Sequence, residues 1–159
     1  MRRAIDALVS EGKLYRMQGK GTFVSHIDLE KTYLMQGFTS NILSLGMHPS
    51  SRVLASGLCQ PGADVRRDLE LEEEEPVFCL KRVRLADFEP IAVERVWLSA
   101  QRFPRVAEFD YSETSLYEVL RKEYDLEPAY SRQRLNAILA EGEDARLLFG
   151  AKKGVALRM

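Results

Sequence analysis

The sequence has little of what metal sites, disulfide-rich folds and membrane spans require. Its 159 residues include only two cysteines and two histidines. Cys59 and Cys79 match no metal-ligand spacing, so we predict no metal site, no cofactor and two reduced thiols in the core. No signal peptide and no apolar run long enough to span a bilayer are present, which predicts a cytoplasmic protein without a membrane partner.

The chain also has almost no net charge, since 23 Lys and Arg residues face 24 Asp and Glu residues. Overall charge therefore indicates no nucleic-acid partner. The first 25 residues differ, because five basic residues there outnumber two acidic ones. Hydrophobic residues make up 45% and charged residues 30%, which fits one domain of ordinary size or one domain with a fragment of another.

The basic N-terminal part has the pattern of a helix followed by a hairpin. Apolar residues spaced for one helix face predict a helix over residues 2–11, which Gly12 ends. Strands are expected at 14–17 and 22–24 around a glycine-containing tip. A winged helix ends in this way, with the helix in the major groove and the wing near phosphates. A surface helix and hairpin without a DNA role would show the same spacing.

Two strand-like segments, 77–85 and 91–98, predict an antiparallel hairpin at the centre of the chain. Side chains alternate along a strand, so Arg82 and Arg84 share one face, and both faces of this strand should be largely covered. Two neighbouring buried arginines need an acidic side chain or a bound anion. Glu94 is a possible partner if the strand register places it opposite. A cross-strand salt-bridge ladder and an anion pocket both remain open from these residues.

Further elements are expected along the rest of the chain. A short helix over 37–46 should be capped by Thr39 or Ser40, and its free N–H groups could hold an anion. The glutamates at 72–75 read as a solvated turn. The chain is expected to continue beyond Met159, because its last residues resemble a core strand. Other helices are predicted at 61–70, 113–124 and 142–149, and other strands at 49–60, at 129–139 and from 154 onward.

The N-terminal residues resemble the closing half of the DNA-binding domain of GntR-family transcriptional regulators. The resemblance rests on the helix Arg2 to Gly12, the strand Leu14-Tyr15-Arg16, and the wing Gln18 to Val24 with its Gly-Lys-Gly-Thr-Phe-Val motif. It implies a partial winged-helix domain at 1–25 whose first helices would precede Met1, and a linker at 26–36. The residues implied to contact operator DNA are Arg2, Arg3, Gln18, Gly19, Lys20, Gly21 and Thr22.

Residues 37–159 resemble the UTRA effector-binding domain of the HutC-like branch of that family, whose fold is similar to chorismate lyase. The matching motifs are Phe38-Thr39, Arg82 to Asp87, Glu89 to Ala92, and Thr114 to Tyr117. The resemblance implies an α+β fold with an antiparallel sheet and flanking helices, incomplete at its C-terminus. It also implies an effector site formed by Phe38, Thr39, Ser40, Arg82, Arg84, Glu94, Ser115 and Tyr117.

The expected function is a cytoplasmic, homodimeric transcriptional regulator, most simply a repressor, whose operator affinity is controlled by a small anionic effector such as a sugar phosphate or organic acid. One alternative is a stand-alone ligand-binding or dimerisation module without DNA activity. Another is an enzyme of the chorismate-lyase type. The wing motif argues against catalysis. So does the placement of His26 and His48 in linker and turn sequence, away from any nucleophile pattern.

Overall fold

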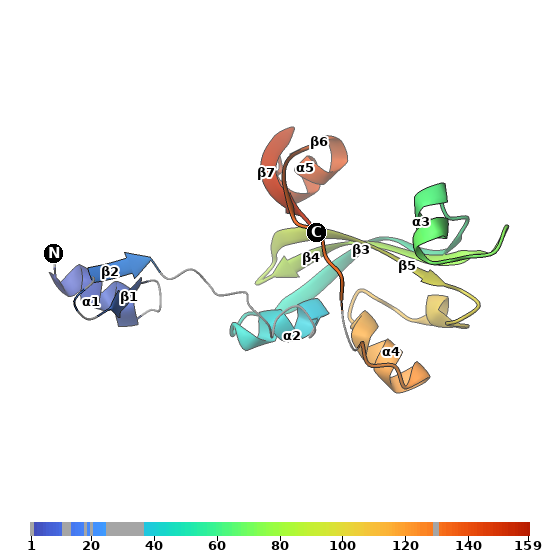
Figure 1. Ribbon diagram of the computed structural model, residues 1–159, viewed down its shortest axis with the longest axis horizontal. Coiled ribbons are helices and arrows are strands. Elements are labelled where there is room, and N and C mark those ends of the chain that lie inside the picture. The colour runs from blue at the N-terminus through green and yellow to red at the C-terminus, as the bar shows by residue number, and fades with distance from the viewer. Residues whose placement is uncertain (1, 11–13, 18, 20, 25–36, 129–130) are drawn as a thin grey trace. The chain divides into compact units, whose positions relative to one another are not determined.

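The computed structural model describes residues 2–10, 14–17, 19, 21–24, 37–128 and 131–159, and Figure 1 shows its elements. The chain separates into two compact units, Met1–Leu34 and Met35–Met159. The predicted linker 26–36 lies outside the described residues. The predicted domain boundaries therefore stay predictions.

The first unit contains a helix and a two-stranded hairpin, as the sequence predicts. Helix α1 (Arg2–Ser10) is followed by strands β1 (Leu14–Met17) and β2 (Gly21–Val24), which pair in antiparallel register with Leu14 opposite Val24. Arg16 of β1 forms an ion pair with Asp6 of α1. Gly19 has a φ of +76°, a left-handed conformation that glycine adopts without strain. Gln18 and Lys20 lie outside the described residues.

A three-stranded antiparallel sheet forms the centre of the second unit. Its order is β3 (Pro49–Cys59), β4 (Val77–Ala86) and β5 (Glu89–Ser99). The register places Arg82 of β4 opposite Glu94 of β5. A tight turn of two residues with positive φ, Asp87 and Phe88, joins β4 to β5, which matches the twist of paired strands. The expected central hairpin is confirmed.

Different elements cover the two faces of the sheet, as Figure 1 shows. On one face, Phe78 and Leu80 of β4 pack with buried residues of the 3₁₀ helix η1 (Val106–Glu108) and of α4 (Leu116–Tyr124). On the other, α5 (Gly142–Phe149) packs against β5, and its Glu143 binds Lys81 of β4 at 2.6 Å. The prediction that both faces of β4 are covered is therefore confirmed.

Smaller elements complete this unit. Helix α2 (Gly37–Ser44) packs against β3, and α3 (Ala63–Asp68) follows β3 in the chain. Strands β6 (Asn136–Glu141) and β7 (Lys153–Arg158) precede and follow α5 in the chain and pair with each other in antiparallel orientation. No helix in the described part of the chain has the length and apolar character of a membrane span.

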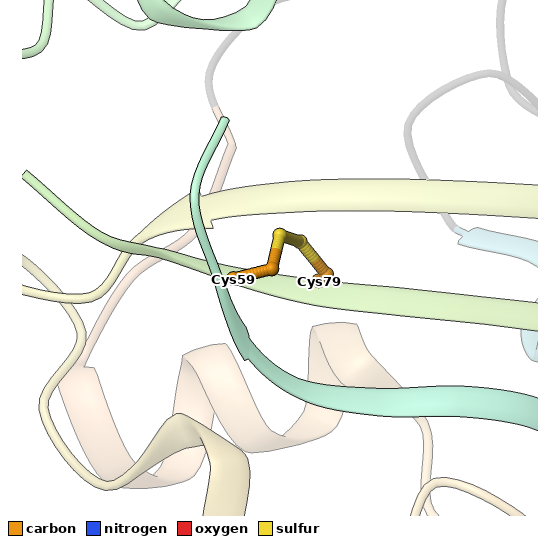
Figure 2. The surroundings of a disulfide bond; sticks show 2 residues. All are labelled: Cys59 and Cys79. Atoms are coloured by element: carbon orange, nitrogen blue, oxygen red, sulfur yellow. A yellow bond between two sulfur atoms is a disulfide. The ribbon is translucent and has the colours of Figure 1, made fainter. Parts of the chain in front are cut away.

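The expectation of two reduced thiols is wrong, because the structure joins Cys59 to Cys79 in a disulfide (Figure 2). The register explains the pairing. Cys79 lies opposite Gly57, and Cys59 is two residues further along β3, so both side chains are on the same face of adjacent strands. Spacing in the sequence does not reveal this register.

Several element boundaries also differ from the prediction; α3 spans only Ala63–Asp68, and α4 begins only at Leu116. The strand expected at 129–139 begins only at Asn136, where pairing starts opposite Arg158 of β7. The polar residues just before Asn136 form no regular structure in the described range. Helix α2 begins at Gly37, so Thr39 and Ser40 lie in its first turn and are not its caps. This shift leaves the Thr39 hydroxyl available to another side chain.

Candidate anion-binding site

Arg82 is buried, and two of its guanidinium nitrogens bond to protein groups. The residue is 3% exposed. Its Nε donates a hydrogen bond to Glu94 Oε2 at 2.5 Å, and its Nη1 donates to the backbone oxygen of Tyr111 at 3.3 Å. The cross-strand salt bridge, one of the two interpretations left open by the sequence, therefore exists at this position. Glu94 offsets the charge of Arg82 inside the protein.

Arg84 is equally buried, at 3% exposure, but has fewer partners. Its guanidinium carbon lies 4.0 Å from the ring centre of Phe38, in a cation–π contact. Its Nη2 donates a hydrogen bond to Thr39 Oγ1 at 3.1 Å. Its Nε and Nη1 are buried and have no hydrogen-bond partner in the described structure. A buried donor without a partner costs about 1–3 kcal/mol, so this site is suited to an acceptor.

The surroundings of Arg84 disfavour its positive charge. Burial is the main cause, the nearby charge of Arg82 adds to it, and Glu94 opposes it, which together lower the pKa of Arg84 to about 10. The guanidinium is still charged at neutral pH. An anion beside it would compensate for the lost hydration of the guanidinium and for the repulsion by Arg82.

Both arginines line a cavity of about 210 Å³. Its lining includes charged and hydroxyl-bearing residues together with apolar side chains from β5, α4 and the segment after α4. The lining residues are Phe38, Arg82, Arg84, Glu94, Val96, Leu98, Ser115, Leu116, Tyr117, Leu120 and Pro128.

A close contact between α2 and α4 positions Phe38 at this cavity. Gly37 begins α2 with a φ of +71°, and a Cβ atom there would lie 2.7 Å from Cδ2 of Tyr117. Only glycine permits the ring to approach so closely in this backbone conformation. Phe38 and Thr39, the next two residues, are thereby held against Arg84.

The structure brings together most of the effector residues predicted from the sequence. Phe38, Arg82, Arg84, Glu94, Ser115 and Tyr117 line the cavity. Thr39 reaches Arg84 without lining the cavity, and Ser40 is exposed and does not line it.

Sequence reasoning missed the apolar wall and the role of Gly37. Strand alternation from Glu94 places Val96 and Leu98 on the same face. Helical spacing likewise pairs Leu116 with Leu120. Both signals were present in the sequence.

Other parts of the second unit are less suited to bind an anion or a metal. A wider hollow of about 550 Å³ is lined by Glu72 to Pro76, Ala100 and Gln101, and lacks any basic lining residue. Among its glutamates, Glu75 already accepts a hydrogen bond from Ser99 at 2.6 Å. Within the described ranges, no three His, Cys, Asp or Glu residues are grouped as a metal site.

The family model and the most similar curated relatives agree with each other. The UTRA domain family model matches residues 44–159. The chain is 30% identical over 149 residues to the uncharacterized HTH-type transcriptional regulator YurK of Bacillus subtilis, covering 93% of this chain and 62% of the relative. It is 31% identical over 157 residues to the HTH-type transcriptional repressor NagR of the same organism, covering 97% and 63%. The chain thus spans less than two thirds of these relatives, which are named as regulators.

A solved structure supports the fold. The crystal structure of PhnF from Mycobacterium smegmatis matches with a TM-score of 0.69 and 23% identity, covering 98% of this chain and 68% of PhnF. At this identity the match shows a shared fold. It agrees with the predicted α+β arrangement of an antiparallel sheet and flanking helices.

Proposed function

Because the chain belongs to the UTRA-domain family of GntR-type transcriptional regulators, we propose that it binds a small anionic metabolite in the cavity around Arg84 and that this binding changes the affinity of the protein for operator DNA. The protein acts as a cytoplasmic homodimer and most simply as a repressor. The observation that carries the proposal is the buried Arg84, whose Nε and Nη1 lack partners in the described structure.

The groups around Arg84 support an anion site. Thr39 and Phe38 hold the guanidinium from the α2 side, and Ser115 and Tyr117 line the cavity from the start of α4. Hydroxyl groups can donate to an anion's oxygen atoms. Because these residues come from three separate elements, a ligand in the cavity would connect α2, β4 and α4.

The first unit supports the DNA half of the proposal. Its helix and hairpin are the elements that enter the major groove and reach the backbone in winged-helix proteins. We propose that Arg2, Arg3 and the wing residues Gln18 to Thr22 contact the operator. An effector could then change operator affinity by favouring one arrangement of the DNA-binding units in the dimer.

A thermal-shift screen of this chain against anionic metabolites tests the ligand half. A ligand at about 100 times its Kd adds about 2.7 kcal/mol to the free energy of unfolding. The shift should disappear in Arg84→Gln. It should persist in Arg95→Gln, because Arg95 binds Asp144 of α5 at 2.6 Å. A shift retained in Arg84→Gln would contradict the assignment of the site.

A DNA-binding assay tests the other half with the gene product that contains this chain. Fluorescence anisotropy on DNA from upstream of its own gene should show binding that the ligand identified above changes. Lys20→Ala should weaken binding evenly across sequences and reduce the salt dependence by about one counterion. Unchanged affinity and salt dependence in Lys20→Ala would contradict the role given to the wing.

A further inference from the structure

The disulfide that joins β3 to β4 (Figure 2) lies behind the apolar wall of the cavity, on the opposite face of the sheet. Cys79 is opposite Trp97 in the register of β4 and β5. The neighbours of Trp97 along β5, Val96 and Leu98, point to the other face, where both line the cavity. The disulfide and the cavity therefore share the same part of the sheet.

Buried side chains connect the two sides of this part of the sheet. Phe78 and Leu80, on either side of Cys79, are fully buried. They belong to one hydrophobic cluster with Leu116 and Leu120 of α4, and these two leucines also line the cavity. Close-packed interiors transmit displacements. A change in how firmly β4 is held would therefore reach α4 and the cavity by direct packing.

The disulfide closes a segment that packs loosely against the rest of the unit. Residues 60–76 lie between β3 and β4, and the helix α3 within them has no buried residue. In the described sheet, β3 itself is an edge strand. Edge strands and segments with little buried surface open more readily than a core. Without the cross-link, the end of β3 and the adjoining part of β4 would be held less firmly.

Both cysteines are open to exchange with small thiols and disulfides. Cys59 and Cys79 are half-buried, so part of each residue is accessible. In a cytoplasm that keeps thiols reduced, the disulfides that do occur are usually transient and serve catalysis or redox sensing. A structural role alone therefore does not fit the setting given under the proposed function.

We propose that Cys59 and Cys79 form a reversible redox site for low-molecular-weight disulfides, and that the oxidised chain binds anions in the cavity more tightly than the reduced chain. The redox site stands independently of the proposed function, whereas its effect on anion binding rests on it. Oxidation restrains the apolar wall before the ligand arrives, and such preorganisation favours binding.

Oxidation proceeds by two exchange steps. The thiolate of one cysteine attacks the small disulfide, which forms a mixed disulfide and releases one small thiolate. The thiolate of the second cysteine then attacks the protein sulfur of the mixed disulfide, which forms the bond between Cys59 and Cys79 and releases the second small thiolate. Two electrons pass from the cysteine sulfurs to the small disulfide, and the two protons lost by the cysteines end on the released thiols.

Glutathione buffers of different ratios of oxidised to reduced form test the redox site. Acid quenching, alkylation and mass spectrometry count the thiols, and the emission of Trp97, the single tryptophan of the chain, follows the state of the neighbouring Cys79. We expect one transition between two thiols and none, with the same curve from either direction. A thiol count that stays constant at every ratio in the folded chain would overturn the redox site and leave the anion site untouched.

Calorimetric titration with inorganic phosphate, at constant ionic strength, tests the effect on the cavity. The Kd should be about fivefold lower for the oxidised chain than for the chain reduced with dithiothreitol, a coupling at the lower end of the usual range. By reciprocity, saturating phosphate should lower the reduction potential by about 20 mV, because tenfold corresponds to about 30 mV for two electrons. Arg84→Gln should abolish phosphate binding and the shift in potential.

The double variant Cys59→Ser with Cys79→Ser is the matched control. Its Kd for phosphate should equal that of the reduced chain and should not respond to dithiothreitol. Equal Kd values of the oxidised and reduced chains, with no shift in potential, would overturn the coupling and leave the proposed anion site intact.

Hydrogen exchange without any anion tests the coupling a second time. The amides of α4 should exchange faster in the reduced chain than in the oxidised chain. If phosphate binds neither form, faster exchange would support the coupling and equal exchange would overturn it. Failure of phosphate and of the broader metabolite screen together would count against the proposed function itself, whereas the glutathione transition would still establish the redox site.

Discussion

Two arginines of the same strand, two residues apart and equally buried, have opposite energetic roles. Arg82 has a carboxylate and a backbone oxygen as partners, so removing it would leave Glu94 without its cation. Arg84 has unpartnered guanidinium donors and a lowered pKa. Its burial without full hydrogen bonding costs stability, a trade-off that the proposed ligand site would explain.

Substitution by methionine should therefore change stability in opposite directions. Arg84→Met should raise the free energy of unfolding of the ligand-free chain by about 1 kcal/mol, because it removes a desolvated cation and keeps apolar volume. Arg82→Met should lower it by about 3 kcal/mol, because it leaves Glu94 unpaired. Urea unfolding of both variants measures the two changes. Destabilisation of similar size in both would show that Arg84 has partners equivalent to those of Arg82.

The sequence predicted that Arg82 and Arg84 lie together, but not which of them pairs with Glu94. Alternation along a strand is enough to place Arg82 and Arg84 on one covered face. Which of them meets Glu94 depends on the register with β5. The turn at Asp87 and Phe88 and the register shift between Arg84 and Leu85 together set that register. Of the two interpretations left open by the sequence, the salt bridge is present at Arg82, whereas the anion pocket at Arg84 stays a prediction.

At the scale of elements, the contact between Gly37 of α2 and Tyr117 of α4 holds the cavity in shape. Gly37→Ala would place a methyl group 2.7 Å from the Tyr117 ring and would strain a φ of +71°. We expect a loss of about 2 kcal/mol in stability and weaker ligand binding, because strain of about 1–3 kcal/mol adds to the clash. Thermal unfolding and titration with an identified ligand measure the two effects.

Gly46→Ala provides the control, since Gly46 has a similar φ of +75° with no atom within 4 Å of its Cβ position. It should show the backbone strain alone and leave ligand binding unchanged. Equal effects of the two substitutions on ligand binding would show that the contact with Tyr117 does not shape the cavity.

Element types were predicted well because their signals are local. Helical spacing, strand alternation and glycine punctuation identified the central hairpin, α4 and α5. The start of β6 was missed because pairing with β7 defines it, and the partner strand lies beyond an intervening helix. The role of Gly37 was missed because it depends on a ring eighty residues away in the sequence.

For the whole molecule, the disulfide between Cys59 and Cys79 bears on both stability and location. It closes a loop with a sequence separation of 20, which in the chain-entropy model stabilises the folded state by about 3 kcal/mol. The proposed cytoplasmic setting normally keeps thiols reduced. The oxidation state of the purified chain is therefore informative.

We expect no reactive thiol in the folded chain purified without reductant, and two after treatment with dithiothreitol. Reduction should lower the melting temperature. The double variant Cys59→Ser with Cys79→Ser should match the reduced chain and should not respond to dithiothreitol. Two reactive thiols in the untreated chain would instead support the expectation drawn from the sequence, that both cysteines are reduced.

The two faces of β4 make different contacts, and this constrains which changes in the β4 sequence the protein can accept. Arg82 and Arg84 face the cavity, while Lys81 between them binds α5 on the other side of the sheet. Insertion or deletion of one codon before Lys81, where no β-bulge absorbs it, would exchange the faces of every following residue of the strand. It would remove the cavity arginines and the anchor of α5 together. The structure therefore predicts that effector preference changes more readily by replacement of side chains in β4 than by a change in the number of its residues.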